Sequence, residues 1–445
     1  MVNNITATRF NNLIKEKISL YNLVAFIYLA GIIILSIMFG LSPLLYFLFA
    51  IIAAVLIIPS YPIGFKLIII MTMIFERFFT LQSLVMEQQI YKLYPLDMVI
   101  GLTILGWLIS FFRPQAEKDR PKIIWEAPEK ILFIFLIISV FYYIRANLDV
   151  NADLEVAFST FKNYTFYPLL YFLTVYSVQN IKIFKNTVQL IFIGGVLIIG
   201  FIAAGFFLGQ GLWTEFTPLS TAGVRFLAGT HGFYLTVSTI ITISLLSFKK
   251  FRNNGFVWAI VWIWLLGIAG SLMRHLWLSL AFGVLVLFIF MPNKNKRGLI
   301  RCFINNGLVI LSLAAIIFLV INLYPAQINS NYFKVMQNLK QRVASVANVN
   351  EDTSAAWRLE LWRSAKKVWL TEPVFGVGFG KKISFESEGW QTAEKIRNIH
   401  NSPLAIMVQM GVIGLAFFVI FVLLVVVKGL KYIYRDKELM PYYLG

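Results

Sequence analysis

Long apolar segments without an alternating pattern constrain the fold of this chain more than any other feature. The segments from Leu190 to Leu208 and from Ser402 to Val427 are long enough to cross a bilayer, which takes about 20 residues of helix. Only helices and closed barrels satisfy their own backbone hydrogen bonds inside lipid. Barrel strands alternate polar and apolar side chains, and these segments do not. The sequence therefore predicts an all-α, polytopic integral membrane protein.

The composition supports this class and argues against a soluble globule. Charged residues make up 13% of the 445-residue chain, whereas soluble domains carry about 25%. A net charge of +18 would suggest nucleic acid as a partner of a soluble protein, but membrane proteins concentrate lysine and arginine in cytoplasmic loops. Cys302 is the only cysteine, so neither an internal disulfide nor a cysteine-based metal site is possible. We expect lipid, and no nucleic acid, as a partner.

Apolar segments and basic loops together predict the topology. We expect about twelve transmembrane helices, near residues 20–39, 42–59, 63–75, 96–112, 130–145, 165–178, 188–208, 230–247, 256–270, 276–291, 303–323 and 402–427. Loops rich in lysine and arginine alternate with loops poorer in bases, and the base-rich loops are expected in the cytoplasm. The alternation assigns the long polar segment from Tyr324 to Asn401 to the extracytoplasmic side.

Three regions follow from this topology. Residues 1–323 hold the first eleven transmembrane helices, residues 324–401 form the extracytoplasmic loop, and residues 402–445 form the last helix with a basic tail. The tail ends in Met440-Pro-Tyr-Tyr-Leu-Gly445, which is similar to the start of another span. We therefore expect the natural protein to continue beyond this point.

The extracytoplasmic loop is predicted to contain one helix. Thr353 or Ser354 is a suitable N-cap, and Pro373 limits the far end. Apolar residues recur at helical spacing in between, at Trp357, Leu361, Ala365 and Val368. We expect this apolar stripe to lie on the membrane domain or at the lipid interface. The opposite face, with Arg363, Lys366 and Lys367, is expected to be exposed to water.

A glycine-rich segment in the same loop, Phe375-Gly-Val-Gly-Phe-Gly-Lys-Lys382, superficially resembles a phosphate-binding loop. Such a loop requires Gly-x-x-x-x-Gly-Lys-Ser/Thr. Phe375 stands at the position of the first glycine, and Lys382 stands where serine or threonine is required. We expect no nucleotide here, and a tight turn that uses the ability of glycine to adopt positive φ.

Three residues point to chemistry on a phosphate-bearing lipid. His400 lies where the long loop returns to the membrane, and histidine is the side chain best suited to move a proton near neutral pH. Arg225 and Arg274 lie at predicted outer helix ends without an acid nearby in sequence. Arginine binds phosphate oxygens through a bidentate fork. The alternative for both arginines is snorkelling to lipid headgroups or a charge at a helix C-terminus.

Other titratable residues on the outer side are interpreted more simply. The three histidines, His231, His275 and His400, form no metal-ligand motif, so no metal is expected. The acids Asp149, Asp153 and Glu155 are interpreted as a solvated loop. The bases Arg77, Lys92, Arg145 and Lys162 lie in outer loops that also carry acids, and we expect them to be solvated or paired.

The order and spacing of several motifs resemble the O-antigen ligase and O-antigen polymerase superfamily. An arginine precedes a mid-chain span at Arg225, and Ser271-Leu-Met-Arg274 is a looser form of a Ser-Arg pair between two spans. In the long loop, the family's Arg-x-x-x-Trp is matched by Arg358-Leu-Glu-Leu-Trp362, its proline by Pro373, and its Gly-x-Gly-x-Gly by Gly376-Val-Gly-Phe-Gly380. The loop ends in His-Asn-x-x-Leu, matched by His400-Asn-Ser-Pro-Leu404. Further along, Gly-x-x-Gly is matched by Gly411-Val-Ile-Gly414. Two departures are Gln409, where many members have Glu, and His275, where a small residue is usual.

This resemblance implies a bacterial cytoplasmic-membrane glycosyltransferase of cell-envelope or lipopolysaccharide biosynthesis that needs no metal or cofactor. The donor would be a glycan on undecaprenyl or another polyprenyl diphosphate, with its lipid tail in a groove between helices. Arg225 and Arg274, with Arg358 as a weaker candidate, would bind the diphosphate, and His400 would take the acceptor proton in an inverting transfer. The supporting loop would include Trp362, Gly376, Gly378, Gly380 and Asn401.

The resemblance leaves the acceptor open. A ligase, a polysaccharide polymerase and a protein glycosylase would share these residues. The alternative from another class is a flippase for lipid-linked oligosaccharides or another polysaccharide transporter. A transporter is expected to carry charges at mid-membrane and paired repeats or broken helices. The sequence shows no repeat, and its arginines lie at outer helix ends, which favours the enzyme.

Overall fold

The computed structural model describes most of the helices and the C-terminal part of the long loop. The described residues are 42–75, 84–86, 91–112, 125–178, 181–208, 229–251, 254–301, 353–387, 390–435 and 440–444, with single positions at 24, 27, 28, 31, 227, 303, 304 and 307. The chain forms two compact units. Unit 1 contains Met1–Ile183 and Gly378–Lys381, and unit 2 contains Phe184–Val377 and Lys382–Gly445.

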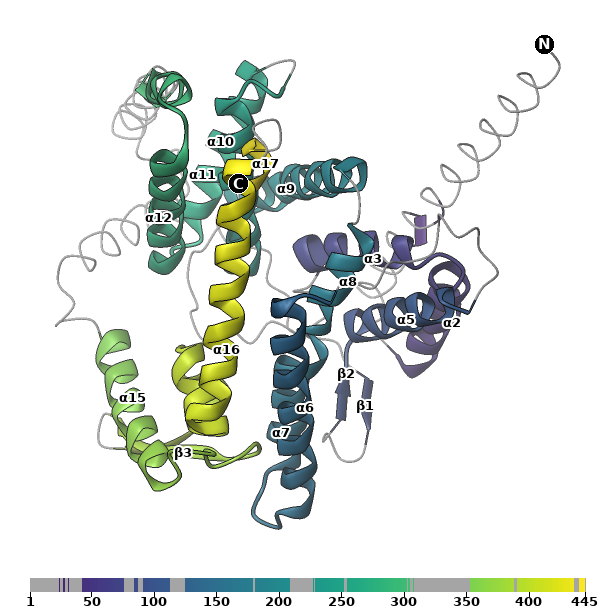
Figure 1. Cartoon of the computed structure of the whole chain (residues 1–445), viewed down its shortest axis with the longest axis vertical. Helices are drawn as coiled ribbons and strands as arrows, with labels where there is room; N and C mark the ends of the chain where they lie inside the picture. Colours follow the sequence, from purple (N-terminus) through teal and green to yellow (C-terminus); the bar gives the residue numbers. More distant parts are fainter. Residues whose placement is uncertain are drawn as a thin grey trace. The chain divides into compact units, whose positions relative to one another are not determined.

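Unit 1 is built from apolar helices and one small hairpin (Figure 1). Its elements are α2 (Pro43–Ile57), α3 (Tyr61–Ile70), the π-helix η1 (Met71–Phe75), strands β1 (Leu84–Met86) and β2 (Tyr91–Leu93), α5 (Pro95–Ser110), α6 (Ala127–Leu148), α7 (Leu154–Phe161), the π-helix η3 (Lys162–Phe166) and α8 (Leu169–Ser177). Proline in the first turn starts α2, α3, α5 and α6, where its missing N–H costs no hydrogen bond.

A buried ion pair lies at the N-terminal end of α5 in unit 1. Lys162 Nζ lies 2.7 Å from Asp97 Oδ2, and both side chains are less than a tenth exposed. The same ammonium donates to the Lys92 carbonyl at 2.8 Å, and the Tyr167 hydroxyl donates to Asp97 Oδ1 at 2.8 Å. Lys92 itself pairs with Glu155 at 2.8 Å. The expectation of pairing is confirmed for both lysines, but Lys162 lies in a helix and not in a solvated loop.

The segment Gly378–Lys381 packs within unit 1 against α6 and α7. Phe379 is 1% exposed and contacts the rings of Tyr142 and Tyr164. The Asp153 backbone N–H donates to the Gly380 carbonyl at 2.9 Å, and Lys381 Nζ lies 2.6 Å from Asp149 Oδ2.

The interpretation of these acids as a solvated loop needs correction, because they are only partly exposed and each has a partner. Asp153 accepts a hydrogen bond from the Val156 N–H and caps α7. Asp149 and Glu155 are both paired with lysines. These pairs could not be predicted from the sequence, because Lys92 and Lys381 lie far from the acids along the chain.

Unit 2 combines transmembrane-type helices with a helix–hairpin module. Its elements are most of α9 (Ile181–Leu208), then α10 (Gly229–Ser247), α11 (Asn254–Gly270), α12 (Arg274–Phe290), α15 (Thr353–Thr371), strands β3 (Lys382–Ser387) and β4 (Trp390–Lys395), the 3₁₀ turn η6 (Ile396–Asn398), α16 (Ser402–Arg435) and α17 (Met440–Leu444). The fully buried Trp264 of α11 donates its indole N–H to the Gly195 carbonyl of α9 at 2.9 Å, which ties these helices together.

The helical, membrane-type character of the chain is confirmed. Four described helices are long and apolar enough to cross a membrane: Ala127–Leu148, Ile181–Ala203, Gly229–Ser247 and Ser402–Ile433. Five shorter apolar helices coincide with other predicted spans. The predicted spans near 20–39 and 303–323 lie almost wholly outside the described residues, and the count of about twelve stays a prediction. The all-α prediction needs one correction, because β1–β2 and β3–β4 form two antiparallel hairpins.

A break divides α16 near its start. Gly411 has φ 67° and ψ −168°, a conformation essentially restricted to glycine. The Val412 N–H, which has no helical partner at such a break, donates instead to the Pro373 carbonyl at 3.0 Å. Residues before the break are mostly buried in the protein, whereas many after it expose apolar side chains. The 24 residues from Val412 to Arg435 rise about 36 Å as a helix, enough for a bilayer core of about 30 Å.

We expect Gly411→Ala to destabilise this arrangement strongly. A Cβ at Gly411 would lie 2.0 Å from the Val374 carbonyl oxygen, and the φ of 67° is unfavourable for alanine. Backbone strain and overpacking each cost about 1–3 kcal/mol. The thermal unfolding midpoint of the detergent-solubilised protein should fall by several degrees. Gly429→Ala in the same helix is the matched control, because nothing lies within 4 Å of its Cβ position. Equal thermal unfolding midpoints for Gly411→Ala and Gly429→Ala would contradict the helix break at Gly411.

Candidate active site

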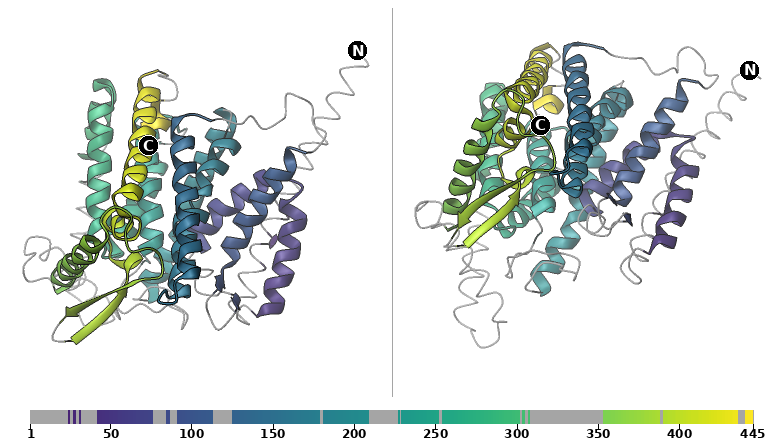
Figure 2. Two further views of the ribbon diagram at one scale, coloured as in Figure 1. Left: turned by 60° about the horizontal axis from the view of Figure 1, so that its bottom comes forward. Right: turned by 90° about the horizontal axis from the view of Figure 1, so that it is seen from below.

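The helix–hairpin module of unit 2, which comprises α15, β3, β4 and the start of α16, has its own apolar core. Leu361 and Ala365 of α15 are fully buried against Ile383 and Phe385 of β3, with Ile399 and Ala405 near the start of α16. Trp357 and Val368 pack around them. Figures 1 and 2 show α15 and the hairpin beside the N-terminal end of α16. The helix and its exposed basic face are therefore as predicted. The apolar stripe packs on α16, which contains a predicted span, and also on the hairpin, which was not predicted.

His400 is held by hydrogen bonds on both sides of it in the chain. The Trp362 indole N–H donates to the carbonyl of Ile399 at 2.7 Å. The Leu404 N–H donates to Asn401 Oδ1 at 3.1 Å, which makes Asn401 the N-cap of α16. His400 adopts φ 55° between these two anchors. A positive φ is uncommon outside glycine and is often found at functional sites, where the surrounding structure enforces it.

The imidazole of His400 lies between an aromatic ring and groups of both charges. Its ring centroid is 6.3 Å from that of Trp357 on α15, and the residue as a whole is exposed. Partial burial lowers the pKa of His400 below its usual value of 6.5, the Arg358 guanidinium lowers it further, and the Glu394 carboxylate opposes both. The lowered pKa keeps the imidazole neutral at physiological pH, so it can accept a proton.

Glu394 is a residue that the sequence did not single out. It lies on β4, where its Oε1 accepts hydrogen bonds from the Asn398 side chain at 2.9 Å and from the Lys395 backbone at 3.0 Å. A carboxylate near a general base stabilises the imidazolium that forms when the base takes a proton. The hairpin that positions Glu394 was not predicted, so nothing in the local sequence distinguished this acid from its neighbours.

Arg274 is the first residue of α12, directly after a tight turn from α11. Ser271 is fully buried and donates its hydroxyl to the Ile268 carbonyl at 2.7 Å, and Leu272 has φ 55°. Arg274 begins its own helix, so its charge does not lie at the C-terminus of α12. The N-terminus of a helix is the positive end of its dipole and favours anions. Helix and guanidinium together attract a phosphate group.

The surroundings of the chain at Arg274 differ from those at His400. Next to Arg274, Met273 packs on α10, where a Cβ at Gly229 would lie 2.2 Å from the Met273 methyl carbon. His400 contacts α15 and the hairpin module. The structure therefore brings Arg358 to His400 and places Arg274 among α10, α11 and α12. Arg225 lies outside the described residues.

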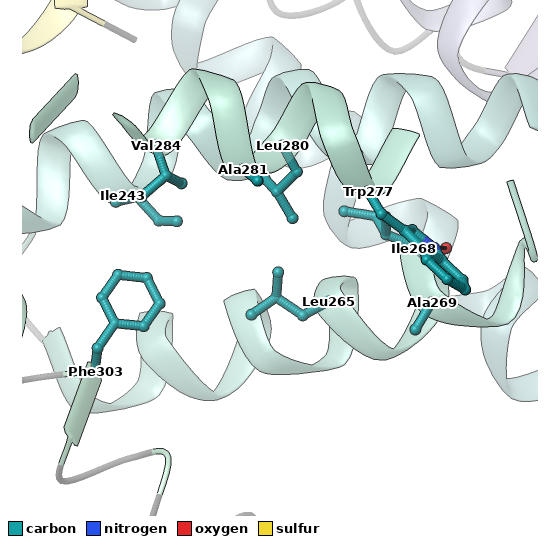
Figure 3. Close-up of a pocket in the computed structure, with 9 residues that line it drawn as sticks. All are labelled: Ile243, Leu265, Ile268, Ala269, Trp277, Leu280, Ala281, Val284 and Phe303. Carbon is teal, nitrogen blue, oxygen red and sulfur yellow. Dashed lines mark hydrogen bonds between the residues drawn. The ribbon is translucent and has the colours of Figure 1, made fainter. Parts of the chain in front are cut away.

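An apolar groove begins one helical turn from Arg274. It encloses about 650 Å³ and is lined by Ile243, Leu265, Ile268, Ala269, Trp277, Leu280, Ala281, Val284 and Phe303. Figure 3 shows Trp277 and Ile268 at one end, Leu265 and Leu280 along the middle, and Phe303 at the other end. The one polar group of Trp277 is satisfied, because its indole N–H donates to the Ile268 carbonyl at 3.1 Å. Such a groove suits a hydrocarbon chain.

The three glycines of the loop motif adopt the expected positive φ, with values of 73° at Gly376, 86° at Gly378 and 81° at Gly380. Gly376 also allows a close backbone approach, because a Cβ there would lie 2.5 Å from the Gly411 nitrogen. Gln409, next to this approach, is fully buried, and its amide has no hydrogen-bond partner among the described residues. Gln409 cannot ionise, so its amide offers neutral polar atoms at this point.

The described residues define a helical membrane protein that presents a histidine-centred site on a folded loop and an arginine beside an apolar groove. Residues 259–419 match the family model described as O-antigen ligase, which confirms the resemblance to the O-antigen ligase superfamily. The match extends from α11 to the first part of α16 and includes Arg274, Arg358 and His400. No curated protein and no solved structure matches the chain. The apolar helices and the family match together support a membrane protein of glycan ligation or polymerisation.

Proposed function

We propose that this protein is a membrane glycosyltransferase that moves a glycan from polyprenyl diphosphate to an acceptor hydroxyl on the outer face of the bacterial cytoplasmic membrane. The observation that carries the proposal is His400, a partly desolvated imidazole whose pKa is lowered and whose backbone is fixed on both sides. A neutral, rigidly placed imidazole at the end of a membrane helix suits proton removal from a hydroxyl.

The reaction needs one proton acceptor and a stabiliser for the leaving diphosphate. The acceptor oxygen attacks the anomeric carbon while its proton passes to His400, and the bond from that carbon to the diphosphate oxygen breaks. The charge that builds on the departing diphosphate is stabilised by Arg274 and Arg225, with Arg358 as a weaker contributor. Attack from the side opposite the leaving group inverts the configuration at the anomeric carbon. No step needs a metal or a cofactor.

Two features of unit 2 support the placement of the donor. The apolar groove that starts beside Arg274 accommodates part of the polyprenyl tail while the guanidinium holds the diphosphate. The loop residues Trp362, Asn401 and Gly376 hold His400 and the α16 break in position.

The pH dependence of transfer tests the role of His400. The neutral imidazole is the reactive form, so the rate should fall as the pH drops through its pKa, below 6.5. Because Arg358 lowers this pKa, Arg358→Gln should move the acid limb of the pH–rate profile to higher pH. Arg363→Gln is the matched control, since Arg363 lies on the same helix, is highly exposed and pairs with Glu360. An acid limb that stays in place, or moves to lower pH, in Arg358→Gln would count against His400 as the base.

A further inference from the structure

The C-terminal end of α15 and the turn that follows it expose three large apolar side chains. Leu370, Val374 and Phe375 are 58%, 51% and 60% exposed. The turn that carries them is well ordered by hydrogen bonds: the Trp369 indole N–H donates to the Pro373 carbonyl at 3.1 Å, and the Gly376 N–H donates to the Glu372 carbonyl at 2.8 Å. These hydrogen bonds therefore hold the three side chains in their exposed positions.

This apolar cluster is continuous with the wall of α16 that faces lipid. The Val412 N–H donates to the Pro373 carbonyl, so the turn is attached at the first residue after the Gly411 break. Val412 is 49% exposed, and the helix beyond it exposes Val419, Ile420 and Leu423. Water is not a favourable environment for such a surface, whereas a bilayer that begins at the break would cover it.

Basic residues border the cluster on the adjacent turn of α15. Lys366 and Lys367 are exposed and lie three to four residues before Leu370, so they sit one turn earlier in the helix. Lysines beside exposed apolar side chains match a membrane interface, where the apolar groups enter the acyl boundary and the ammonium groups meet lipid phosphates.

We infer that Leu370, Val374 and Phe375, with Lys366 and Lys367, form an interfacial anchor that docks the helix–hairpin module onto anionic phospholipid of the membrane spanned by α16. The bilayer then begins at Gly411 and not at Ser402, and the first part of α16 belongs to the module above it. This inference concerns the docking of the module and holds whichever reaction the site performs.

Depth measurements by spin labelling test the anchor. In a Cys302→Ser background, Phe375→Cys carries a nitroxide in full-length protein reconstituted in vesicles of phosphatidylethanolamine and phosphatidylglycerol. We expect the ratio of collisions with oxygen to collisions with a water-soluble nickel complex to be several-fold higher at Phe375→Cys than at Leu359→Cys. Leu359 is the matched site, because it is 49% exposed on the same helix but lies on the third turn before Leu370. Equal ratios at the two sites, whether both wet or both in lipid, would overturn the anchor.

The basic residues are tested in the same experiment. Replacing phosphatidylglycerol with phosphatidylcholine should reduce the depth of the label at Phe375→Cys, and Lys366→Gln with Lys367→Gln should reduce it in the anionic vesicles. An unchanged depth in both cases would overturn the anionic headgroup as the partner.

Discussion

Replacing His400 with asparagine is expected to lower the rate of glycan transfer by about 10²- to 10⁴-fold, the usual contribution of a general base. Asparagine is one of the residues that tolerate positive φ, so the backbone at φ 55° should be preserved. Its amide cannot accept a proton near neutral pH. The side chain of His400 is partly exposed, and its replacement leaves no buried cavity.

The variant also separates chemistry from folding. The bonds that fix the loop run from Trp362 to Ile399 and from Leu404 to Asn401, and neither uses the imidazole. Membrane insertion, thermal stability and binding of the lipid-linked donor should therefore match the wild type. A transfer rate near that of the wild type in His400→Asn would remove this residue from the mechanism.

Loss of Arg274 is expected to impair both donor binding and transfer. Removing one donor that stabilises a developing negative charge typically costs about 10²- to 10³-fold in rate. Arg274→Ala should show a loss of this order with weaker binding of the polyprenyl diphosphate. Arg274→Lys should recover only part of it, because lysine keeps the charge but lacks the planar fork.

Arg297→Ala is the matched control for Arg274. Arg297 is exposed just after the opposite end of α12, in a segment predicted to face the cytoplasm, so its loss should leave transfer unchanged. If Arg274→Ala and Arg297→Ala both transferred glycan at the wild-type rate, Arg274 would be a snorkelling residue without a role in the reaction.

The sequence predicted the elements of the fold better than their contacts. Hydropathy placed helices such as α6, α10 and α11 within a few residues of their observed bounds, because apolar periodicity is a local property. The same periodicity predicted α15 and its buried Leu361 and Ala365. The surface that covers this stripe could not be predicted, because it comes from the hairpin and α16, which follow later in the chain.

The burial of Lys162 and the helix break at Gly411 depend on contacts between residues that lie far apart in the chain. Lys162 is buried only because Asp97, on another helix, neutralises it at 2.7 Å. Gly411 was visible as part of Gly-x-x-Gly, but its break depends on a carbonyl of the Pro373–Val374 turn. For the site, the sequence identified His400 and Arg358, whose proximity the structure establishes, and missed Glu394, which lies on the unpredicted hairpin.

The central claim is that the protein forms a glycosidic bond, and a reconstituted transfer reaction tests it most directly. Purified protein in liposomes would receive a polyprenyl-diphosphate donor with a labelled glycan, together with lipid A core, lipid-linked repeat units or glycoprotein acceptors in separate reactions. We predict a covalent product with inverted anomeric configuration and release of polyprenyl diphosphate for one of these acceptors, and none with His400→Asn. Movement of the labelled glycan across the bilayer without a covalent product from any acceptor would contradict the account and favour a transporter.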